Sequence, residues 1–312
     1  MPEVTIQDVV GDVYETLRGE FVSDDPVMRG ILGRVFSTPG KGIRPLFMEM
    51  VARRNGGGWE SIRTAAMVVE AVHIASLIHD DVVDCSKMRR GETTLHMHYS
   101  DKVSVLFGDY VFMKAIIMAH SIGNSDAVRV IHHAVARMIE GEIRDSLHTR
   151  LLDEDSYLSI IGDKTASLFA AAAEAGIILT GGGPRERLYA RELGEAVGTA
   201  FQIIDDTLDF QGDAEVMGKP ALMDLHGGFP TLPVIHALSG YDAVEVDRIL
   251  GGDGESADRL LAVVRDRGGI EYAHERARGF IRKGREMLGF LGDGDMTGEF
   301  DRFFEMIVER RA

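Results

Sequence analysis

The chain has little cysteine, little proline and comparatively few basic residues. Cys85 is the only cysteine among 312 residues, so an internal disulfide is excluded and a reducing compartment fits. Eight prolines and the absence of low-complexity tracts favour a single domain over residues 1–312. The N-terminal stretch carries acids where a secretion signal needs a basic start, and no uninterrupted apolar run is long enough to span a bilayer. We therefore expect a cytoplasmic protein with no transmembrane segment.

Acidic residues outnumber basic ones by 50 to 34, which gives a formal net charge of −16. This balance argues against nucleic acid and anionic membranes as partners, because both would be repelled by the surface. The apolar fraction of 45% is large enough for a sizeable core.

Apolar residues recur at spacings of three and four along most of the chain, and the alternation typical of strands is hardly visible. The stretch LFAAAAEAG at 168–176 is rich in small residues, which would let one helix backbone approach another closely. The pattern predicts an all-α bundle of about ten or more helices. The expected helices are 3–20, 44–54, 60–84, 103–121, 125–148, 155–179, 186–210, 229–238, 255–267, 270–290 and 297–310.

Two copies of the pattern DDxxD stand far apart in the chain, in HDDVVD at 79–84 and in IDDTLD at 204–209. On a helix, the first and last carboxylates of such a pattern share one face, so their negative charges repel. Each copy also ends an apolar segment, where the helix dipole disfavours acids. Hard oxygen ligands in this arrangement suit Mg²⁺ bound together with a diphosphate. The candidate metal ligands are Asp80, Asp81, Asp84, Asp205, Asp206 and Asp209.

A single DDxxD is usually a solvated helix end without a function. Two copies on apolar segments change that balance, because unpaired carboxylates near a buried surface are costly unless a cation compensates them.

Cationic residues recur where a diphosphate would need them. Lys41 and Arg44 stand three residues apart at an expected loop-to-helix junction, where free backbone N–H groups also attract anions. Arg89 and Arg90 follow the first DDxxD, and guanidinium groups match phosphate oxygens in a bidentate way. A structural alternative makes these arginines partners of helix-end carbonyls. His73 lies two helical turns before Asp80, where a lone histidine is most often a satisfied core residue.

The order of these segments resembles the trans-prenyl diphosphate synthases, also called polyprenyl synthetases. The matching segments are GKGIRP, EAVHIASLIHDDVVDCSKMRRG, FGDYVF, DKTASLF, GTAFQIIDDTLDF and GKPALMDLHGGFPTLPVI, all within 40–235. The resemblance implies an all-α bundle around a deep central cavity, the isoprenoid synthase fold, and a homodimer. It also implies three Mg²⁺ ions per active site, with Mn²⁺ as a substitute, bridging the aspartates to an allylic diphosphate.

By the same resemblance, the chain transfers a dimethylallyl, geranyl or farnesyl group from its diphosphate to isopentenyl diphosphate. Cations stabilise the departing diphosphate, and the remaining allylic cation is attacked by the double bond of isopentenyl diphosphate. The resemblance assigns the metal to Asp80, Asp84 and Asp205, with the other three aspartates as further or supporting ligands. It assigns the allylic diphosphate to Arg89, Lys164 and Lys219, isopentenyl diphosphate to Lys41, Arg44, His73 and Arg90, and the surroundings of the cation to Thr165 and Gln202.

The residues four and five positions before Asp80 are Ser76 and Ala75. In the resembled family, aromatic residues there stop the product at farnesyl length, whereas small ones let it grow. We therefore expect a product of twenty carbons or more, with a long-chain polyprenyl diphosphate favoured over geranylgeranyl diphosphate.

Three positions depart from the family's common pattern: Gly42 and Phe229 replace cationic residues, and Asp145 replaces a glutamine. Features of the sequence argue against three other functions. A class I terpene cyclase would carry a different second metal motif, a non-catalytic partner subunit would usually lack one aspartate cluster, and a simple diphosphate-binding module would not need the small residues beside the first cluster.

Overall fold

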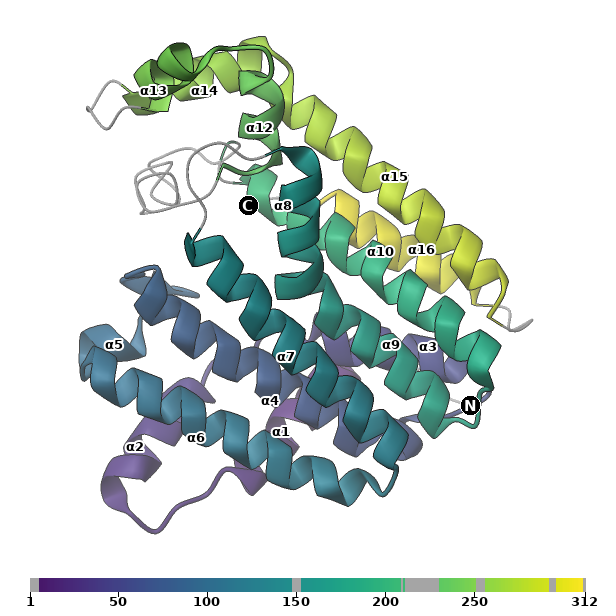
Figure 1. Cartoon of the computed structure of the whole chain (residues 1–312). Helices are drawn as coiled ribbons and strands as arrows, with labels where there is room; N and C mark the ends of the chain where they lie inside the picture. Colours follow the sequence, from purple (N-terminus) through teal and green to yellow (C-terminus); the bar gives the residue numbers. More distant parts are fainter. Residues whose placement is uncertain are drawn as a thin grey trace. The chain divides into compact units, whose positions relative to one another are not determined.

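The computed structural model describes residues 6–147, 153–208, 210, 230–250, 256–291 and 296–310, and the described chain is almost entirely helical (Figure 1). By backbone contacts the chain divides into two compact units. The first contains the described residues of 1–133 and 171–190, and the second contains those of 134–170, 191–291 and 296–312. The expectations of a single domain and of a central cavity stay predictions.

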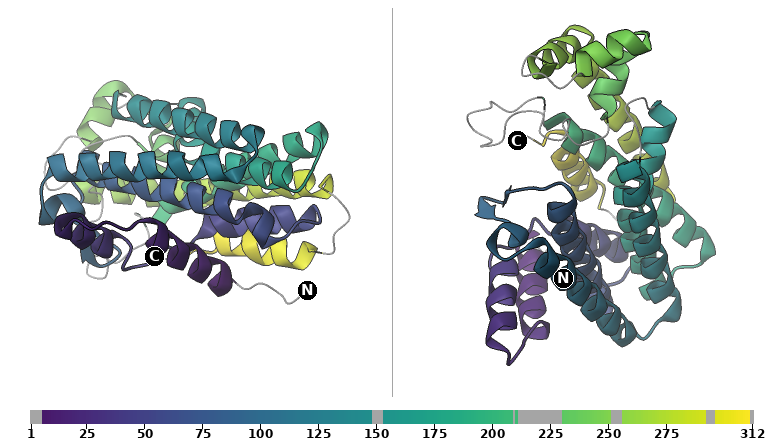
Figure 2. Two further views of the ribbon diagram at one scale, coloured as in Figure 1. Left: turned by 90° about the horizontal axis from the view of Figure 1, so that it is seen from below. Right: turned by 60° about the vertical axis from the view of Figure 1, so that its left-hand side comes forward.

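The first unit is built on one long helix. Helix α4 (Trp59–Val83) packs against α6 (Asp101–Ala119), α3 (Ile43–Arg54) and α1 (Ile6–Glu20). Figure 2 shows α4 and α6 running alongside each other. Gly108 on α6 leaves room for the ring of His79 on α4, because a Cβ there would lie 2.3 Å from His79 Nε2. The other elements that lie wholly in this unit are α2 (Pro26–Val35), β1 (Met88–Arg89), β2 (Glu92–Thr93), α5 (Leu95–His98) and the 3₁₀ turn η1 (His120–Ile122).

The second unit contains α8 (Glu154–Ile161), which continues through a π-helical turn, η2 (Gly162–Ala166). Helix α12 (Leu232–Leu238) packs against α8, α14 (Ser256–Asp266) and α15 (Gly269–Gly289), and α15 packs against α16 (Thr297–Val308). Three helices contribute residues to both units: α7 (Ser125–Leu147), α9 (Ser167–Leu179) and α10 (Pro184–Leu208). The remaining described helix of this unit is α13 (Ala243–Leu250).

The small residues of 168–176 do bring helix backbones close together, as the sequence predicts. In the second unit, a Cβ on Gly194 of α10 would lie 2.5 Å from Ala170 Cα, and one on Gly198 would lie 2.6 Å from Ala166 Cα. Both distances are too short for a side chain, so glycine on α10 and alanine opposite it set the spacing of the two segments.

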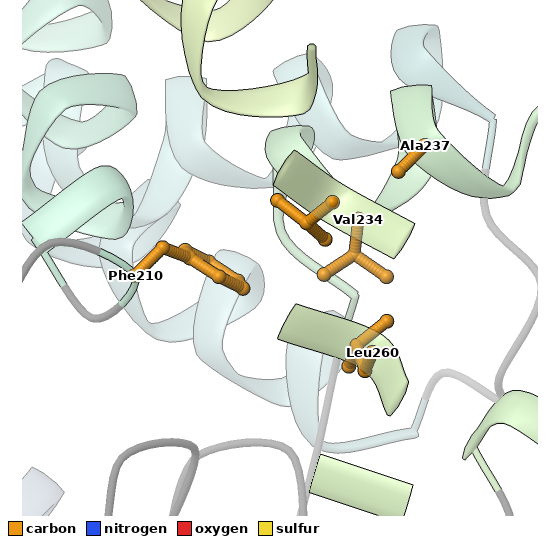
Figure 3. Close-up of a cluster of buried hydrophobic side chains, with 5 residues drawn as sticks. Phe210, Val234, Ala237 and Leu260 are labelled. Carbon is orange, nitrogen blue, oxygen red and sulfur yellow. The ribbon is translucent and has the colours of Figure 1, made fainter. Parts of the chain in front are cut away.

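An apolar cluster in the second unit holds the chain immediately after the second aspartate motif. Phe210 is buried with Val234 and Ala237 of α12 and with Leu260 and Val264 of α14. The ring of Phe210 points toward Val234 (Figure 3). Burial of this side chain contributes about 2–3 kcal/mol and restrains the end of α10.

The all-α expectation is confirmed, and each expected helix has a counterpart. The sequence patterns did not indicate α2, α5, α13 or the β1–β2 hairpin. Two described segments, Trp59–Val83 and Asp101–Ile122, are long and apolar enough to cross a membrane by length and composition alone. The apolar window of the first is 67% buried, which is typical of a core helix. The expectation of no transmembrane segment stays a prediction.

Candidate active site

The first aspartate group lies at the C-terminal end of α4. This end carries no basic residue in its last turn, so the helix dipole and the carboxylates repel each other. Asp81 is only 6% exposed, and Arg89 Nε donates to its Oδ1 over 2.6 Å. Asp80 is half-buried and Asp84 is exposed. Arg89 therefore supplies a positive charge that compensates the buried carboxylate.

A tight hairpin positions the two arginines. Met88 pairs with Thr93 and Arg89 with Glu92, so Arg90 and Gly91 form the two-residue turn. Both have positive φ, 52° and 77°, as expected of a turn that matches the twist of a hairpin. Arg90 adopts the left-handed region despite its side chain, which is uncommon outside glycine, asparagine and aspartate. The turn directs the two side chains apart, so that Arg89 binds Asp81 and Arg90 binds the carbonyl of Thr38.

Arg90 reaches the loop before α3. Its Nη1 donates to the carbonyl of Thr38 over 3.4 Å, and a Cβ on Gly40 would lie 2.6 Å from Arg90 Nη2. Gly40 is thus required for the guanidinium to pack on the loop. Arg44 is buried on α3, whereas Lys41 is exposed. The first unit therefore brings Arg44 and Arg90 close enough to His73 for both charges to act on its imidazole.

A buried carboxyl group that the sequence analysis missed lies near Arg44 and Arg90. Glu70 on α4 is 1% exposed and accepts a hydrogen bond of 2.7 Å from the hydroxyl of Tyr14 on α1. Burial raises the pKa of Glu70, although Tyr14, Arg44 and Arg90 all favour its charged form. Glu70 stands three residues before His73, so a charged residue on the same apolar helix face was the available sequence signal.

The second aspartate group lies in the last turns of α10, which also carry no basic residue in the described part. Asp206 accepts from two side chains: Tyr157 Oη at 2.6 Å on Oδ2 and Gln202 Nε2 at 2.7 Å on Oδ1. Burial, followed by the charge of Asp206, raises the pKa of Tyr157 well above its usual value. Thr165 Oγ1 donates to Gln202 Oε1 over 2.7 Å, so the two residues assigned to the surroundings of the cation lie in one chain of hydrogen bonds.

Asp205 is held by a residue that the sequence analysis did not single out. Arg310 Nη1, two residues after α16, lies 2.7 Å from Asp205 Oδ1. The guanidinium carbon also lies 4.8 Å from the centre of the Phe201 ring. An arginine far from both motifs carries no local signal in the sequence. Asp209 and Lys219 lie outside the described residues.

Lys164 is placed by the π-helical turn and held by two acids. Its Nζ lies 2.7 Å from Asp145 Oδ2 and 2.8 Å from Glu142 Oε2. Burial lowers the pKa of Lys164, but the charges of Asp145 and Glu142 outweigh it and raise the pKa above its usual value. π-Turns often occur at functional sites, where they aim side chains that a regular helix would direct elsewhere. Lys164 is therefore fully charged.

Two of the three departures from the family pattern have a structural explanation. Gly42 caps α3 with a φ of 54°, and a Cβ there would lie 2.7 Å from Val10 Cγ2, so a side chain would be strained. Asp145 compensates the charge of Lys164. Phe229 lies outside the described residues.

The aspartate oxygens at the ends of α4 and α10 suit Mg²⁺, which completes its ligands with water and phosphate, better than a metal whose ligands all come from the protein. Among the described residues, no group of three His, Cys, Asp or Glu side chains is arranged to hold a metal ion. Mg²⁺ typically takes one or two carboxylates and completes its six ligands with water and substrate phosphate oxygens. The aspartates at each helix end supply such hard oxygens, with cationic side chains beside them. The expected metal ligands therefore remain a prediction that suits this chemistry.

The sequence model of the polyprenyl synthetase family matches residues 25–266. The chain is 34% identical over 298 residues to the octaprenyl diphosphate synthase of Escherichia coli K12, covering 93% of this chain and 92% of that protein. A crystal structure of polyprenyl synthase from Caulobacter crescentus CB15, complexed with calcium and isoprenyl diphosphate, is similar with a TM-score of 0.89, at 29% identity, over 100% of both chains. A decaprenyl diphosphate synthase from Rhodobacter capsulatus is similar with a TM-score of 0.89 at 31% identity, over 98% of this chain and 97% of that one.

His73 makes the stability of the chain depend on pH. Burial lowers its pKa well below the ordinary 6.5, and Arg44, Arg90 and Arg89 add to this effect. Below pH 6.5 the unfolded chain therefore binds a proton at His73 that the folded chain does not, so stability falls as pH falls, by at most about 1.4 kcal/mol per pH unit from this group. We predict that His73→Gln reduces this slope, measured by urea unfolding between pH 8 and pH 5. The difference at pH 8 gives the packing effect of the substitution, and identical slopes in both proteins would contradict the prediction.

Proposed function

The chain belongs to the polyprenyl synthetase family and is a trans-prenyl diphosphate synthase, and from that premise we propose that it condenses isopentenyl diphosphate with an allylic diphosphate, with Mg²⁺, to give a trans-polyprenyl diphosphate of C20 or longer. The observation that carries the proposal is the pairing of Asp81 with Arg89 at the end of α4. A buried acid and a guanidinium side by side offer a metal ligand and a phosphate donor within one short segment.

The proposed reaction requires no protein nucleophile. When bound, Mg²⁺ supplies charge neutralisation for the diphosphate leaving group. We assign the allylic diphosphate to Arg89, Lys164 and Lys219, whose positive charges would stabilise the negative charge that develops on the leaving group as the C–O bond breaks. For Lys164, binding exchanges part of its contact with Asp145 and Glu142 for phosphate oxygens. Thr165 and Gln202 orient Asp206 and face the developing cation with hydroxyl and amide groups.

Isopentenyl diphosphate is assigned to Lys41, Arg44, His73 and Arg90. Burial and the neighbouring arginines keep His73 uncharged at neutral pH, so it contributes a hydrogen bond and Arg44 and Arg90 contribute the positive charge. The exposed Lys41 attracts the diphosphate from solvent.

The long-chain assignment is supported by the octaprenyl and decaprenyl diphosphate synthases among the relatives. On α4, Ala75 is fully buried whereas Ser76 is half-buried. Of the two small residues, Ser76 is therefore the one whose side chain still reaches accessible space and can limit the growing product.

We also propose a homodimer that buries the exposed apolar face of α6. This face contains Val105, Leu106, Met113, Ile116 and Ile117, all exposed. An exposed apolar stripe of this length marks an interaction surface. A second copy is its occupant, because an isologous contact between two such stripes would bury them together. A cytoplasmic location is likewise proposed, in keeping with the single free thiol of Cys85.

The catalytic assignment predicts that Asp80→Asn and Asp205→Asn each lower kcat by about 10²-fold or more, because each removes a hard anionic ligand. The assay supplies labelled isopentenyl diphosphate, each allylic primer in turn and Mg²⁺, and sizes the dephosphorylated products. Chelation should abolish the activity, and added Mg²⁺ or Mn²⁺ should restore it. Asp155→Asn, at an exposed position on α8, is the control and should retain wild-type activity. Wild-type rates in both active-site variants would exclude the assignment, and a cyclic hydrocarbon product would support a terpene cyclase instead.

The product-length assignment predicts that Ser76→Phe shortens the main product, because the ring would occupy the path of the growing chain. The control is Leu77→Phe, one residue further along α4 and also half-buried, since it projects about 100° away around the helix. Chromatography of the dephosphorylated products gives the chain lengths. An unchanged length in Ser76→Phe shows that this residue does not line the path.

The dimer proposal predicts that Met113→Glu combined with Ile117→Glu shifts the protein to a monomer, because charges of the same sign would be buried at the interface without partners. Light scattering coupled to size exclusion measures the mass. Val27→Glu on α2, an exposed apolar residue outside the stripe, is the matched control and should leave the mass unchanged. A mass of one chain in the wild type would refute the dimer itself.

A further inference from the structure

Tyr157 is a buried tyrosine whose hydroxyl is directed at an aspartate of the second group. It lies on α8, its side chain is 0% exposed, and its Oη lies 2.6 Å from Asp206 Oδ2. A buried tyrosine hydroxyl requires a hydrogen-bond partner, and here that partner is a charged carboxylate, which gives a strong bond. Neither DDxxD motif nor any segment of the family resemblance contains Tyr157.

The other oxygen of the same carboxylate is also held by the protein. Gln202 lies one helical turn before Asp206, and its Nε2 donates to Oδ1 over 2.7 Å. Thr165 donates to the amide oxygen of Gln202, which leaves the amide nitrogen facing Asp206. Donors on both oxygens fix the rotation of the carboxylate as well as its position.

The π-helical turn that contains Thr165 explains how one continuous segment supplies both the hydroxyl that binds Asp206 and the hydroxyl that binds Gln202. Eight residues of regular α-helix would separate the two side chains by about 80° around the axis. The wider turn of η2, Gly162–Ala166, advances less per residue, so it keeps Thr165 nearer to the face of Tyr157. Both residues then contact the pair Gln202 and Asp206 on α10.

We propose that Tyr157 is a positioning residue for the prenyl transfer: it holds Asp206 in the orientation in which the second aspartate group receives the metal and the allylic diphosphate. The inference rests on the proposed function, which assigns Asp206 to that group. Each oxygen of Asp206 accepts one of these two hydrogen bonds, and carboxylate oxygens have two acceptor sites each, so the bonds orient Asp206 without preventing it from binding a cation. Donors of this kind, one step removed from a metal, typically change affinity or activity by about 10–100-fold when they are lost.

Tyr157→Phe tests the inference because it removes the hydroxyl and keeps the ring. The full-length protein is titrated with Mn²⁺ in the presence of inorganic pyrophosphate, with free Mn²⁺ followed by electron paramagnetic resonance. The variant should bind Mn²⁺ about tenfold more weakly. It should also have a raised KM for the allylic diphosphate, an unchanged KM for isopentenyl diphosphate, and a rate that rises toward the wild-type value as Mg²⁺ is increased.

Tyr272→Phe is the matched control in the same unit. Its hydroxyl donates to Glu154 on α8, a carboxylate outside both aspartate groups, so the same atom is lost from a comparable bond. Mn²⁺ binding and both KM values should remain at their wild-type values in this variant.

Three outcomes would overturn the inference. The first is wild-type Mn²⁺ affinity in Tyr157→Phe while Asp206→Asn loses affinity, which would leave the proposed function intact. The second is a lowered thermal midpoint with both KM values changed equally and no rescue by Mg²⁺, which would reduce Tyr157 to a structural role. If Asp206→Asn itself binds Mn²⁺ like the wild type, the assignment of Asp206 in the proposed function fails, and the inference fails with it.

Discussion

Negative charge at the C-terminal ends of helices α4 and α10 is the constraint on which the rest of the described site depends. Neither α4 nor α10 has a basic residue in its last turn, so the aspartates there oppose both the helix dipole and one another. The fold compensates them with side chains from elsewhere in the chain. Arg89 pairs with Asp81, and Arg310 pairs with Asp205. These two ion pairs offset part of the negative charge at each helix end.

The cationic side chains proposed to bind diphosphate likewise lie near acidic side chains of the protein. Lys164 is held between Asp145 and Glu142, and Arg44 and Arg90 lie near the buried Glu70. These cations therefore have oppositely charged neighbours within the fold, so their charges are not buried alone. Asp145, which replaces a glutamine of the family pattern, fits this scheme because it adds a second negative partner to Lys164 and opposes the lowering of its pKa by burial.

Much of the fold could be predicted because its signals are local. Helix periodicity placed α4 and α10 to within a few residues, and the DDxxD spacing predicted carboxylates grouped at their ends. Helix α2 was missed although Asp25 caps it and Pro26 begins it, because these ten residues are too short for a clear periodicity. The helical turn at 162–166 was expected within a single helix, but its π geometry depends on what packs around it.

The sequence by itself determined most of the helices, the two acidic motifs and the family, since each rests on residues a few positions apart or on the order of characteristic segments along the chain. Only the tertiary structure decided which groups compensate those acids. Tyr157 meets Asp206 across 49 positions, Tyr14 meets Glu70 across 56, and Arg310 meets Asp205 across 105. No periodicity links residues so far apart, because such pairs form only when packing of the helices brings their side chains within hydrogen-bonding distance.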